Sequence, residues 1–276
     1  MVVAVPELSN PFGTESGKYE AKNFRLEMDK NAPIARLFID RTEKLNAITM
    51  EMRADIVRLF DEIALDEDIR VVVVRGAGEK AFSAGGDIPQ FVDVPVPQLA
   101  NLAYSMSAPE RLNKPVIAAI DGHCYGGGLE FALSCDFRIA TPRSQFAFPE
   151  ITLGALPGSG GTQRAVRLMG MTRAKALVLT GRPITAAEAE HWGLVSWVYP
   201  PEIFDREIDQ LANHLARLSP VALSFAKSVL SNAPDASLAA GFHMEGKAMT
   251  VLTRMEDFRE GVQAWKEKRA AVFKGR

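Results

Sequence analysis

The sequence contains few of the residues on which disulfide-linked and metal-binding proteins depend. Only two of its 276 residues are cysteines, too few for a disulfide framework, and both lie in apolar stretches. We interpret Cys124 and Cys135 as buried thiols, which favours a reducing compartment, and the adjoining His123 as a packed core residue. The four histidines are scattered without the spacing of a metal site, so no metal is expected. They are His123, His191, His214 and His243.

Charge of one sign and long apolar runs are also missing. The net charge is −2, so no basic field attracts nucleic acid or anionic lipid, and neither is expected as a partner. No apolar run approaches the roughly 18 residues that a membrane span needs. Residues 1–20 show no charged region followed by a long apolar segment, so we expect no signal peptide and a cytoplasmic location.

Three common glycine motifs are absent too. The stretch PGSGGTQR at 157–164 has no lysine where a P-loop requires one. No G-x-G-x-x-G follows an early strand, which argues against a Rossmann dinucleotide site. Ser159 has Pro157 where the nucleophile elbow of a hydrolase requires glycine. We therefore expect neither a nucleotide cofactor nor a serine nucleophile of that type.

What is present is an ordinary globular composition, with 47% hydrophobic and 24% charged residues. Short apolar runs predict strands, and residues 49–68 have the spacing of an amphipathic helix with Thr49 as its N-cap. Strands that alternate with helices predict an α/β fold with parallel pairing. The strands are expected at 71–74, 116–122 and 137–141, with a hairpin formed by 24–28 and 34–40. From about residue 185 the strands are expected to stop, and helices are expected at 185–193, 204–219, 220–232, 237–253 and 256–273.

Three consecutive glycines, Gly126 to Gly128, open a predicted helix that carries a lone charge, Glu130. Glycine disfavours helices by roughly 1 kcal/mol relative to alanine, so the run needs a reason. One reason is a tight strand-to-helix turn with close backbone packing. The other is a ligand, because a helix N-terminus presents free N–H groups that glycine lets an oxygen approach. We place Glu130 in the first turn, where the helix dipole favours its ionised form and suits it to act as a general base.

A second glycine turn, at residues 84–86, supports the ligand interpretation. Two such turns can direct two N–H donors at one oxygen, which is the arrangement of an oxyanion hole. A second carboxylate, Glu150, follows Pro149 in an apolar stretch, a position that by itself is more typical of a turn than of a catalyst. Together, two poorly solvated carboxylates and two glycine turns predict an acid–base site beside an anion-stabilising backbone.

In this order, the motifs resemble those of the enoyl-CoA hydratase/isomerase (crotonase) superfamily over about residues 24–274. The resemblance implies a ββα spiral core that binds acyl-CoA, which we assign to 23–200, and a helical trimerisation region, which we assign to 201–276 after an arm at 1–22. It also implies a homotrimer, or a homohexamer built as a dimer of trimers. The motifs are RTEKLNAIT (41–49), AFSAGGDI (81–88), KPVIAAIDGHCYGGGLEFALSCDFRIA (114–140), FAFPEITLGALPGSGGTQR (146–164), LTGRPITAAEAEHWGLV (179–195) and EDFREGVQAWKEKRAAVF (256–273).

The resemblance implies that an acyl-CoA thioester is the substrate and that its carbonyl oxygen lies between the amides of Gly86 and Gly127. In hydratases of the superfamily two glutamates hold a water at the Cα–Cβ bond. Their positions here belong to Glu130, as the base toward the water, and Glu150, as the acid toward Cα. Gly158 matches a glycine whose N–H helps to place that water. Isomerases commonly have an apolar residue at the Glu130 position, so both carboxylates favour hydration of a 2-enoyl-CoA to a 3-hydroxyacyl-CoA.

Other functions stay open at this point. A different superfamily reaction, such as double-bond isomerisation, C–C bond cleavage or hydrolysis, or dehalogenation, predicts a third reactive group, for which Tyr104, Asp87 and His123 are candidates. A non-catalytic binding protein is expected to lack one of the two glutamates or to carry a basic patch. The sequence shows neither feature. No cofactor is implied beyond the CoA of the substrate.

The substrate contacts follow from the same resemblance. CoA is expected along the turns at 41–48 and 83–88, with Leu45, Ala84 and Asp87 near the adenine and Ile88 beside them. Trp265 and Lys268 match C-terminal positions that a neighbouring subunit contributes, although a solvated helix charge is an equal alternative for Lys268.

Residues 87–106 belong to the acyl pocket in the superfamily. Pro89, Pro95 and Pro97 remove amide donors, so we expect this segment to be an extended loop rather than a helix. Phe91 is expected to line the pocket, and Leu99, Leu102 and Met106 line it with Phe91 or belong to the core. Such a loop predicts an unusual acyl group, branched, cyclic or aromatic.

Overall fold

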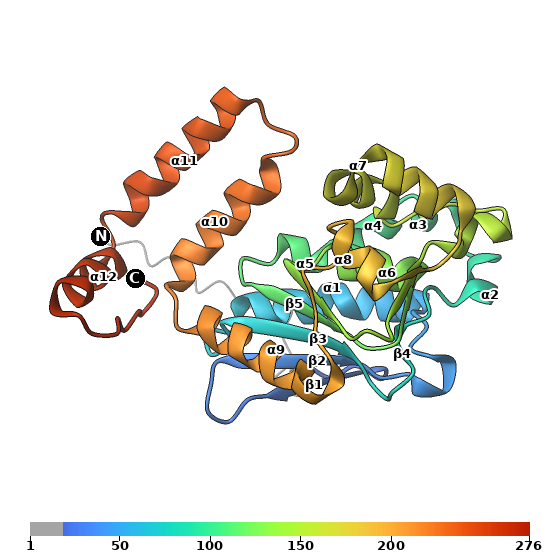
Figure 1. The fold of residues 1–276 in the computed structure, drawn as a ribbon, viewed down its shortest axis with the longest axis horizontal. Coiled ribbons are helices and arrows are strands. Elements are labelled where there is room, and N and C mark those ends of the chain that lie inside the picture. Colours follow the sequence, from blue (N-terminus) through green and yellow to red (C-terminus); the bar gives the residue numbers. More distant parts are fainter. Residues whose placement is uncertain (1–18) are drawn as a thin grey trace, which may run out of the picture.

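A computed structural model describes residues 19–276, and two β-sheets form its centre (Figure 1). The larger sheet has six strands in the order β1-β2-β3-β5-β7-β10. β1 and β2 pair antiparallel, which confirms the predicted hairpin, and the other neighbours pair parallel. Residues 1–18 of the predicted arm lie outside the described residues. The strands are β1 Phe24–Met28, β2 Ile34–Ile39, β3 Val71–Gly76, β5 Val116–Ile120, β7 Phe137–Ala140 and β10 Trp197–Val198.

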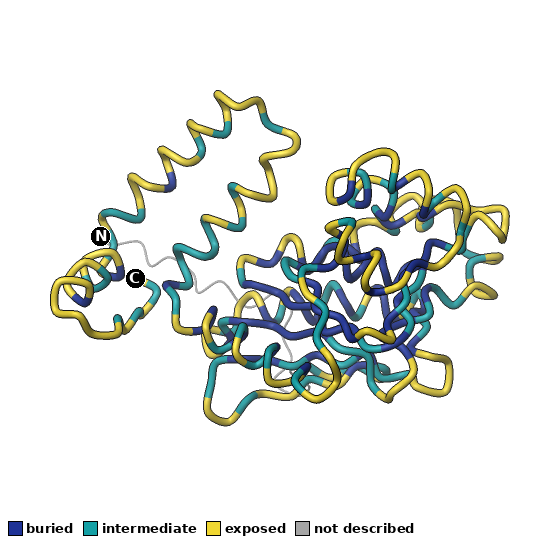
Figure 2. Tube along the Cα trace, in the orientation of Figure 1, coloured by how far each residue is buried: buried dark blue, intermediate teal, exposed yellow. Residues whose placement is uncertain are grey.

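Helices cover both faces of the larger sheet, as a parallel sheet requires. In β3, Val72 and Val74 pack in one apolar core with α1 (Met50–Leu65), and the alternate valines pack in a second core with α9 (Pro201–Ala216). As predicted, Thr49 caps α1, because its side chain accepts a backbone N–H of the first turn. Figure 2 shows the central strands of this sheet, β3 and β5, as buried.

The smaller sheet carries both glycine turns. Its order is β4-β6-β8-β9, with β4, β6 and β8 parallel and β9 antiparallel to β8. The turn at 84–86 follows β4, and α6 (Gly126–Leu133) follows β6 directly. Because parallel strands end at the same edge of a sheet, the two turns lie side by side. The strands are β4 Ala81–Ser83, β6 His123–Tyr125, β8 Gln145–Ala147 and β9 Ile184–Thr185.

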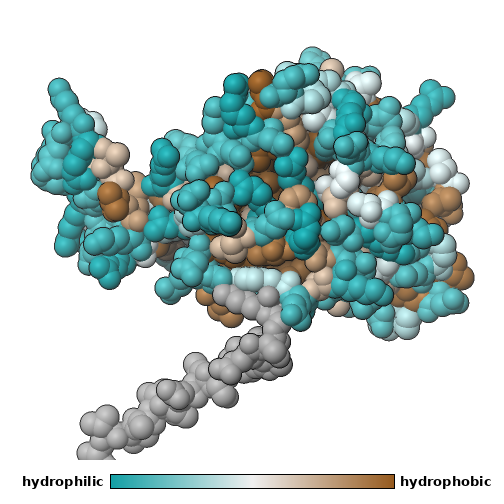
Figure 3. Space-filling model, turned by 90° about the horizontal axis from the view of Figure 1, so that it is seen from below, coloured by the Kyte–Doolittle hydropathy of each residue, from teal (hydrophilic) through white to brown (hydrophobic). Residues whose placement is uncertain are grey.

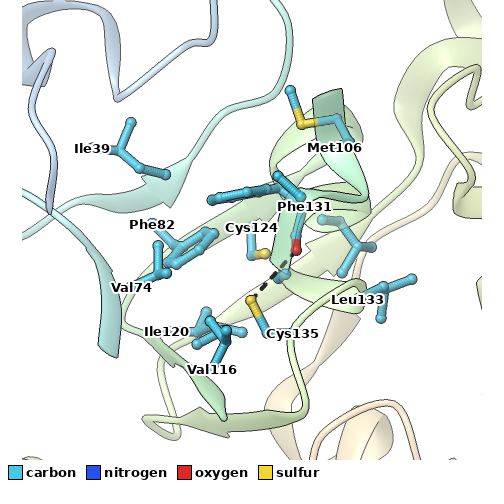
Figure 4. Packing of buried hydrophobic residues seen from close by; sticks show 14 of the residues in the cluster. Ile39, Val74, Phe82, Met106, Val116, Ile120, Cys124, Phe131, Leu133 and Cys135 are labelled. Carbon is cyan, nitrogen blue, oxygen red and sulfur yellow. Dashed lines mark hydrogen bonds between the residues drawn. The ribbon is translucent and has the colours of Figure 1, made fainter. Parts of the chain in front are cut away.

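Both cysteines are free and buried, which confirms their interpretation as core thiols. In Figure 4, Cys124 and Cys135 lie in the apolar core, and Cys135 donates a weak hydrogen bond to the Phe131 carbonyl oxygen at 3.6 Å. Burial raises the pKa of the Cys124 thiol well above its usual range and that of Cys135 to about 12. Neither sulfur is therefore a reactive thiolate at neutral pH.

The prediction that residues 87–106 form an extended loop is wrong. The segment forms three short helices, which continue into α5 (Ala108–Arg111). Pro89 and Pro97 stand in first turns, where an N–H has no acceptor within the helix, and Pro95 is an N-cap. The prolines therefore mark helix starts. The three helices are α2 Ile88–Phe91, α3 Val96–Leu99 and α4 Leu102–Met106.

The expectation that strands stop near residue 185 is also wrong. β10 extends the larger sheet by pairing parallel with β7, with Trp197 opposite Ile139 and Val198 opposite Ala140. Two residues are too few to show a strand's alternation, so the sequence pattern alone does not reveal β10.

The C-terminal region is helical, as expected. α10 and α11 form a hairpin that extends from the body and is largely exposed (Figures 1 and 2). α12 lies at the open end of this hairpin, beside the start of α10, where the Ser219 hydroxyl donates to Asp257 at 2.7 Å. α12 ends at Glu267 and not at 273, because Lys268 has a left-handed backbone with φ 54°. The remaining elements are η1 Thr42–Lys44, η2 Pro149–Leu153, α7 Gly161–Thr180, α8 Ala186–His191, α10 Pro220–Asn232, α11 Leu238–Leu252 and α12 Glu256–Glu267.

Gly128→Ala is expected to destabilise the fold. A Cβ at Gly128 would lie 2.5 Å from the Cβ of Ser83 on β4, and such overpacking costs about 1–3 kcal/mol. Gly246→Ala on α11 is the matched control, because a Cβ there meets no atom within 4 Å and raises helix propensity. Urea unfolding measures both, and a Gly128→Ala protein as stable as the wild type would contradict this packing.

Candidate active site

The turn at 84–86 is held against the segment that precedes α1. The Ile48 N–H donates to the Gly85 carbonyl oxygen at 2.8 Å, and the Asp87 N–H donates to the Ile48 carbonyl oxygen at 2.9 Å. Consecutive N–H groups of an extended chain point to opposite sides, so the Gly86 N–H points away from Ile48. Within the described part of the chain this amide has no hydrogen-bond acceptor.

Gly127 lies directly against that free amide. A Cβ at Gly127 would stand 3.5 Å from the Gly86 nitrogen. Gly127 is the second residue of α6, so its own N–H has no acceptor within the helix. The chain reaches this position through Gly126, whose φ of 48° favours glycine. The two amides expected to form the oxyanion hole therefore lie next to each other.

Glu130 is buried at 2% exposure but does not lie in the first turn of α6, as the sequence analysis expected. The helix begins at Gly126, so Glu130 lies one turn further on. Its hydrogen-bond donors come from the N-terminus of a different helix, α7. Glu130 Oε1 accepts the N–H of Ser159 at 2.6 Å and that of Gly161, the first residue of α7, at 2.9 Å. The two amide donors and the positive end of α7 replace the water that would otherwise solvate this buried carboxyl.

Glu150 has the opposite environment. It stands in η2, and its buried Oε2 has no hydrogen-bond partner among the described residues. Its Oε1 lies 2.8 Å from the position that a Cβ on Gly126 would take, so the carboxyl faces the start of α6. Burial, helped by the negative charge of Glu130, raises the pKa of Glu150 to about 7. At neutral pH one carboxyl can therefore accept a proton while the other holds one.

The other predicted residues divide between the site and its surroundings. Phe91 is half-buried, and its ring edge would lie 2.9 Å from a Cβ on Gly86. Gly158 is exposed, beside Leu102 of α4 and one residue before Ser159. Met106 belongs to the core, where it is fully buried.

The residues expected to hold CoA come together at the surface. The Ala84 N–H donates to the Leu45 carbonyl oxygen at 2.9 Å, which joins the two turns. Asp87 forms an ion pair with Arg41 at 2.8 Å, and Ile88 is exposed next to it. Trp265 stands on α12 and is 78% exposed, and Lys268 is the C-cap residue of that helix.

Arg53 also belongs to the site, although it was not among the residues predicted from the sequence. This side chain on α1 is 4% exposed, and a Cβ at Gly127 would stand 3.3 Å from its Nη2. A signal was present, because Arg53 precedes Ile56 by three residues and Phe60 by seven. It therefore shares the apolar stripe of α1, where an arginine is out of place.

Residues 29–276 match the family model described as enoyl-CoA hydratase/isomerase. The chain is 36% identical over 253 residues to a 2,3-dehydroadipyl-CoA hydratase of Escherichia coli, covering 91% of this chain and 99% of that protein. It is 35% identical over 248 residues to a short-chain-enoyl-CoA hydratase of Clostridium acetobutylicum, covering 88% and 94%. A crystal structure of an enoyl-CoA hydratase from Bacillus anthracis superimposes with a TM-score of 0.87 at 35% identity, covering 92% of this chain and all of that one.

The chain belongs to the enoyl-CoA hydratase/isomerase family. Its α/β fold is the crotonase fold of these structural neighbours, with a helical C-terminal region, as the sequence predicted. As an enoyl-CoA hydratase/isomerase family member it is an enzyme, and an acyl-CoA thioester substrate is consistent with the family. No helix of the described residues is long and apolar enough to cross a membrane.

Glu150→Gln is expected to stabilise this family member in a pH-dependent way. The raised pKa means that the folded protein holds the Glu150 proton up to about pH 7, whereas the unfolded chain loses it near 4.5. Wild-type stability therefore falls as pH rises through this window, and above it the full cost of a buried charge applies. Urea unfolding should show a gain for Glu150→Gln of about 1–2 kcal/mol at pH 8 and much less at pH 5.

The matched control is Glu245→Gln, at an exposed position of α11. It should show no such difference between the two pH values. A gain for Glu150→Gln that is equal at pH 5 and pH 8 would contradict a buried, protonated Glu150.

Proposed function

We propose that the protein is an enoyl-CoA hydratase, which adds water across the 2,3-double bond of a 2-enoyl-CoA to give a 3-hydroxyacyl-CoA. The observation that carries the proposal is the contrast between the two carboxyls: Glu130 accepts two amide hydrogen bonds, and Glu150 accepts none at its buried oxygen. Hydration needs one base and one acid at neighbouring atoms, and this pair provides both beside two free amides.

In the proposed reaction Glu130 takes a proton from water as the water oxygen bonds to Cβ. The electron pair of the double bond moves toward the thioester carbonyl, and the amides of Gly86 and Gly127 donate to the resulting oxyanion. Each such donor contributes on the order of 3 kcal/mol to the transition state. Glu150 then delivers its proton to Cα. The Gly158 N–H helps to place the water, and CoA enters only as part of the substrate.

Leu45, Ala84, Asp87 and Ile88 are proposed to line the path of the CoA moiety. Their backbones already form one surface, because the 45–48 and 84–87 segments are hydrogen-bonded to each other. Phe91 is proposed to face the acyl chain, since its ring lies against Gly86.

Glu130→Gln and Glu150→Gln should each lower kcat by about 10²- to 10⁴-fold while acyl-CoA binding is retained. The physical reason is that glutamine keeps the shape and the hydrogen-bond acceptor but neither takes nor delivers a proton. Loss of the ultraviolet absorbance of the conjugated enoyl thioester measures turnover, and calorimetry measures binding. Near-native turnover by either variant would overturn the two-carboxylate mechanism.

The substrate panel for this assay should run from crotonyl-CoA to branched, cyclic, aromatic and carboxylate-ended enoyl-CoAs. The carboxylate-ended member is included because one relative is named a 2,3-dehydroadipyl-CoA hydratase. A 3-hydroxyacyl-CoA product supports the proposal. If no member is hydrated but a 3-enoyl-CoA is converted to its 2-enoyl isomer, the enzyme is an isomerase and the hydratase proposal is wrong.

We also propose that the chain assembles as a homotrimer, or as a hexamer of two trimers, through its C-terminal helices. Contiguous exposed apolar surface on a globular protein marks an interaction site. Figure 3 shows hydrophobic atoms among hydrophilic ones on the extension that these helices form. In an assembly, Trp265 and Lys268 would contact the substrate of a neighbouring subunit. The large exposed apolar residues of the region are Leu230, Leu238, Phe242, Met249, Val251, Phe258, Val262, Trp265 and Val272.

Phe242→Arg should dissociate this assembly, because it places a charge in an apolar contact. Phe242 is 61% exposed in the single chain. Leu65→Arg is the matched control, since Leu65 is 76% exposed but stands at the end of α1. Sedimentation should show a wild-type and control trimer or hexamer and a smaller Phe242→Arg species. A wild-type monomer would overturn the proposed assembly.

A further inference from the structure

Arg53 is a buried cation, and no carboxylate of residues 19–276 forms an ion pair with it. Its Nη1 donates to Ser159 Oγ at 3.1 Å and to the Leu102 carbonyl oxygen at 3.3 Å. Its Nε is buried and has no hydrogen-bond partner among the described residues. An incompletely paired buried charge destabilises a fold, so its presence here calls for a function.

The guanidinium lies beside the proposed oxyanion hole. A Cβ placed on Gly127 would lie 3.3 Å from the Arg53 Nη2 and 3.5 Å from the Gly86 nitrogen. On another side the central carbon of the guanidinium lies 5.6 Å from the centre of the Phe91 ring. A positive charge is thus placed next to the point where both free amides converge.

Ser159 connects this cation to the buried carboxylate. Its hydroxyl accepts from Arg53, while its N–H donates to Glu130 Oε1 at 2.6 Å. Its carbonyl oxygen accepts from Arg164 at 3.1 Å, which fixes the same residue from the α7 side. Ser159 is therefore held at three points, and its geometry sets how the amide meets Glu130.

We propose that Arg53 is a positioning residue of the acyl-CoA site: through Ser159 it fixes the hydrogen bond to Glu130, and its buried charge favours both ionised Glu130 and the oxyanion of the substrate. The proposal deepens the proposed hydratase function and rests on it for the role of Glu130. Its oxyanion part requires only that the protein binds acyl-CoA thioesters.

The charges around Glu130 come from three elements. Arg53 approaches from α1 and attracts the carboxylate, and Glu150 approaches from η2 and repels it. Arg164, on α7, is engaged by Glu110 at 2.6 Å. Because Glu150 keeps its proton up to about pH 7, removal of Arg53 takes away an attractive charge without leaving a repelling one, and this loss alone disfavours the ionised form of Glu130.

The first test is the pH dependence of kcat/KM for the best enoyl-CoA. Arg53→Met should lower kcat/KM by roughly tenfold to a hundredfold and move its acid limb upward by about one pH unit. Arg53→Lys keeps the charge and should restore much of the acid limb. Arg58→Met is the control, because Arg58 lies on the exposed side of the same helix and pairs with Asp55 and Glu62. An unmoved acid limb in Arg53→Met would overturn the Glu130 part of the proposal.

The second test is spectroscopic and independent of hydration. Acetoacetyl-CoA loses an α-proton to give an enolate with its own near-ultraviolet band, and a site that stabilises the oxyanion favours the bound enolate. The wild type and Arg58→Met should show this band, and Arg53→Met should reduce it at equal occupancy. Equal bands in the wild type and Arg53→Met would overturn the oxyanion part, even if the protein hydrates no enoyl-CoA.

Ser159→Ala keeps the N–H to Glu130 and removes only the acceptor of Arg53. It should shift both readouts in the same direction as Arg53→Met, by a smaller factor. If Arg53→Met does not fold, as circular dichroism would show, Ser159→Ala decides: wild-type values in both readouts would overturn the proposal. A wild type without an enolate band would overturn the oxyanion part together with the proposed oxyanion hole.

Discussion

The rest of the site depends on one buried carboxylate, that of Glu130, and on the two amides of Ser159 and Gly161 that donate to it. These hydrogen bonds join α6 to the start of α7 across 29 and 31 residues of sequence. A carboxylate this buried is tolerated because donors replace its water. Glycine at position 161 makes this contact possible, since a Cβ there would lie 2.9 Å from the Glu130 side chain. The helix that carries one free amide is thereby fixed against the loop that carries Gly158.

The second carboxyl, that of Glu150, differs from Glu130 in its surroundings, and these surroundings determine its pKa. Glu150 faces the start of α6, and burial without a partner at Oε2 among the described residues raises its pKa to about 7, to which the negative charge of Glu130 adds. Two residues of one type thus differ in protonation near neutral pH because their environments differ. A family member that catalyses hydration can use this difference directly, and one that shifts a double bond needs only the proton carrier. The functional distinction therefore rests on how Glu130 is held.

Much of the fold was predictable from the sequence because its signals are local. The valine run of β3, the Thr49 cap and the glycine turns each depend on a few adjacent residues. The failures concern contacts between distant segments. Nothing near Glu130 in the sequence indicates that α7 supplies its donors, and β10 exists only because β7 offers it an edge. The prolines of 87–106 predict an extended loop, but in the structure they stand at the starts of short helices. Arg53 was overlooked because its role depends on Ser159, 106 residues away.

The central claim is that the folded protein keeps the Glu150 proton up to about pH 7, because this carboxyl is buried beside the charge of Glu130, and infrared spectroscopy tests it most directly. A pH titration of the wild type should show the band of a buried carboxylic acid that disappears as pH passes about 7. The band should be absent from Glu150→Gln and present in Glu130→Gln, where it titrates at lower pH because the repelling charge is gone. A band that persists in Glu150→Gln and vanishes in Glu130→Gln would assign the proton to the wrong carboxyl and contradict the account.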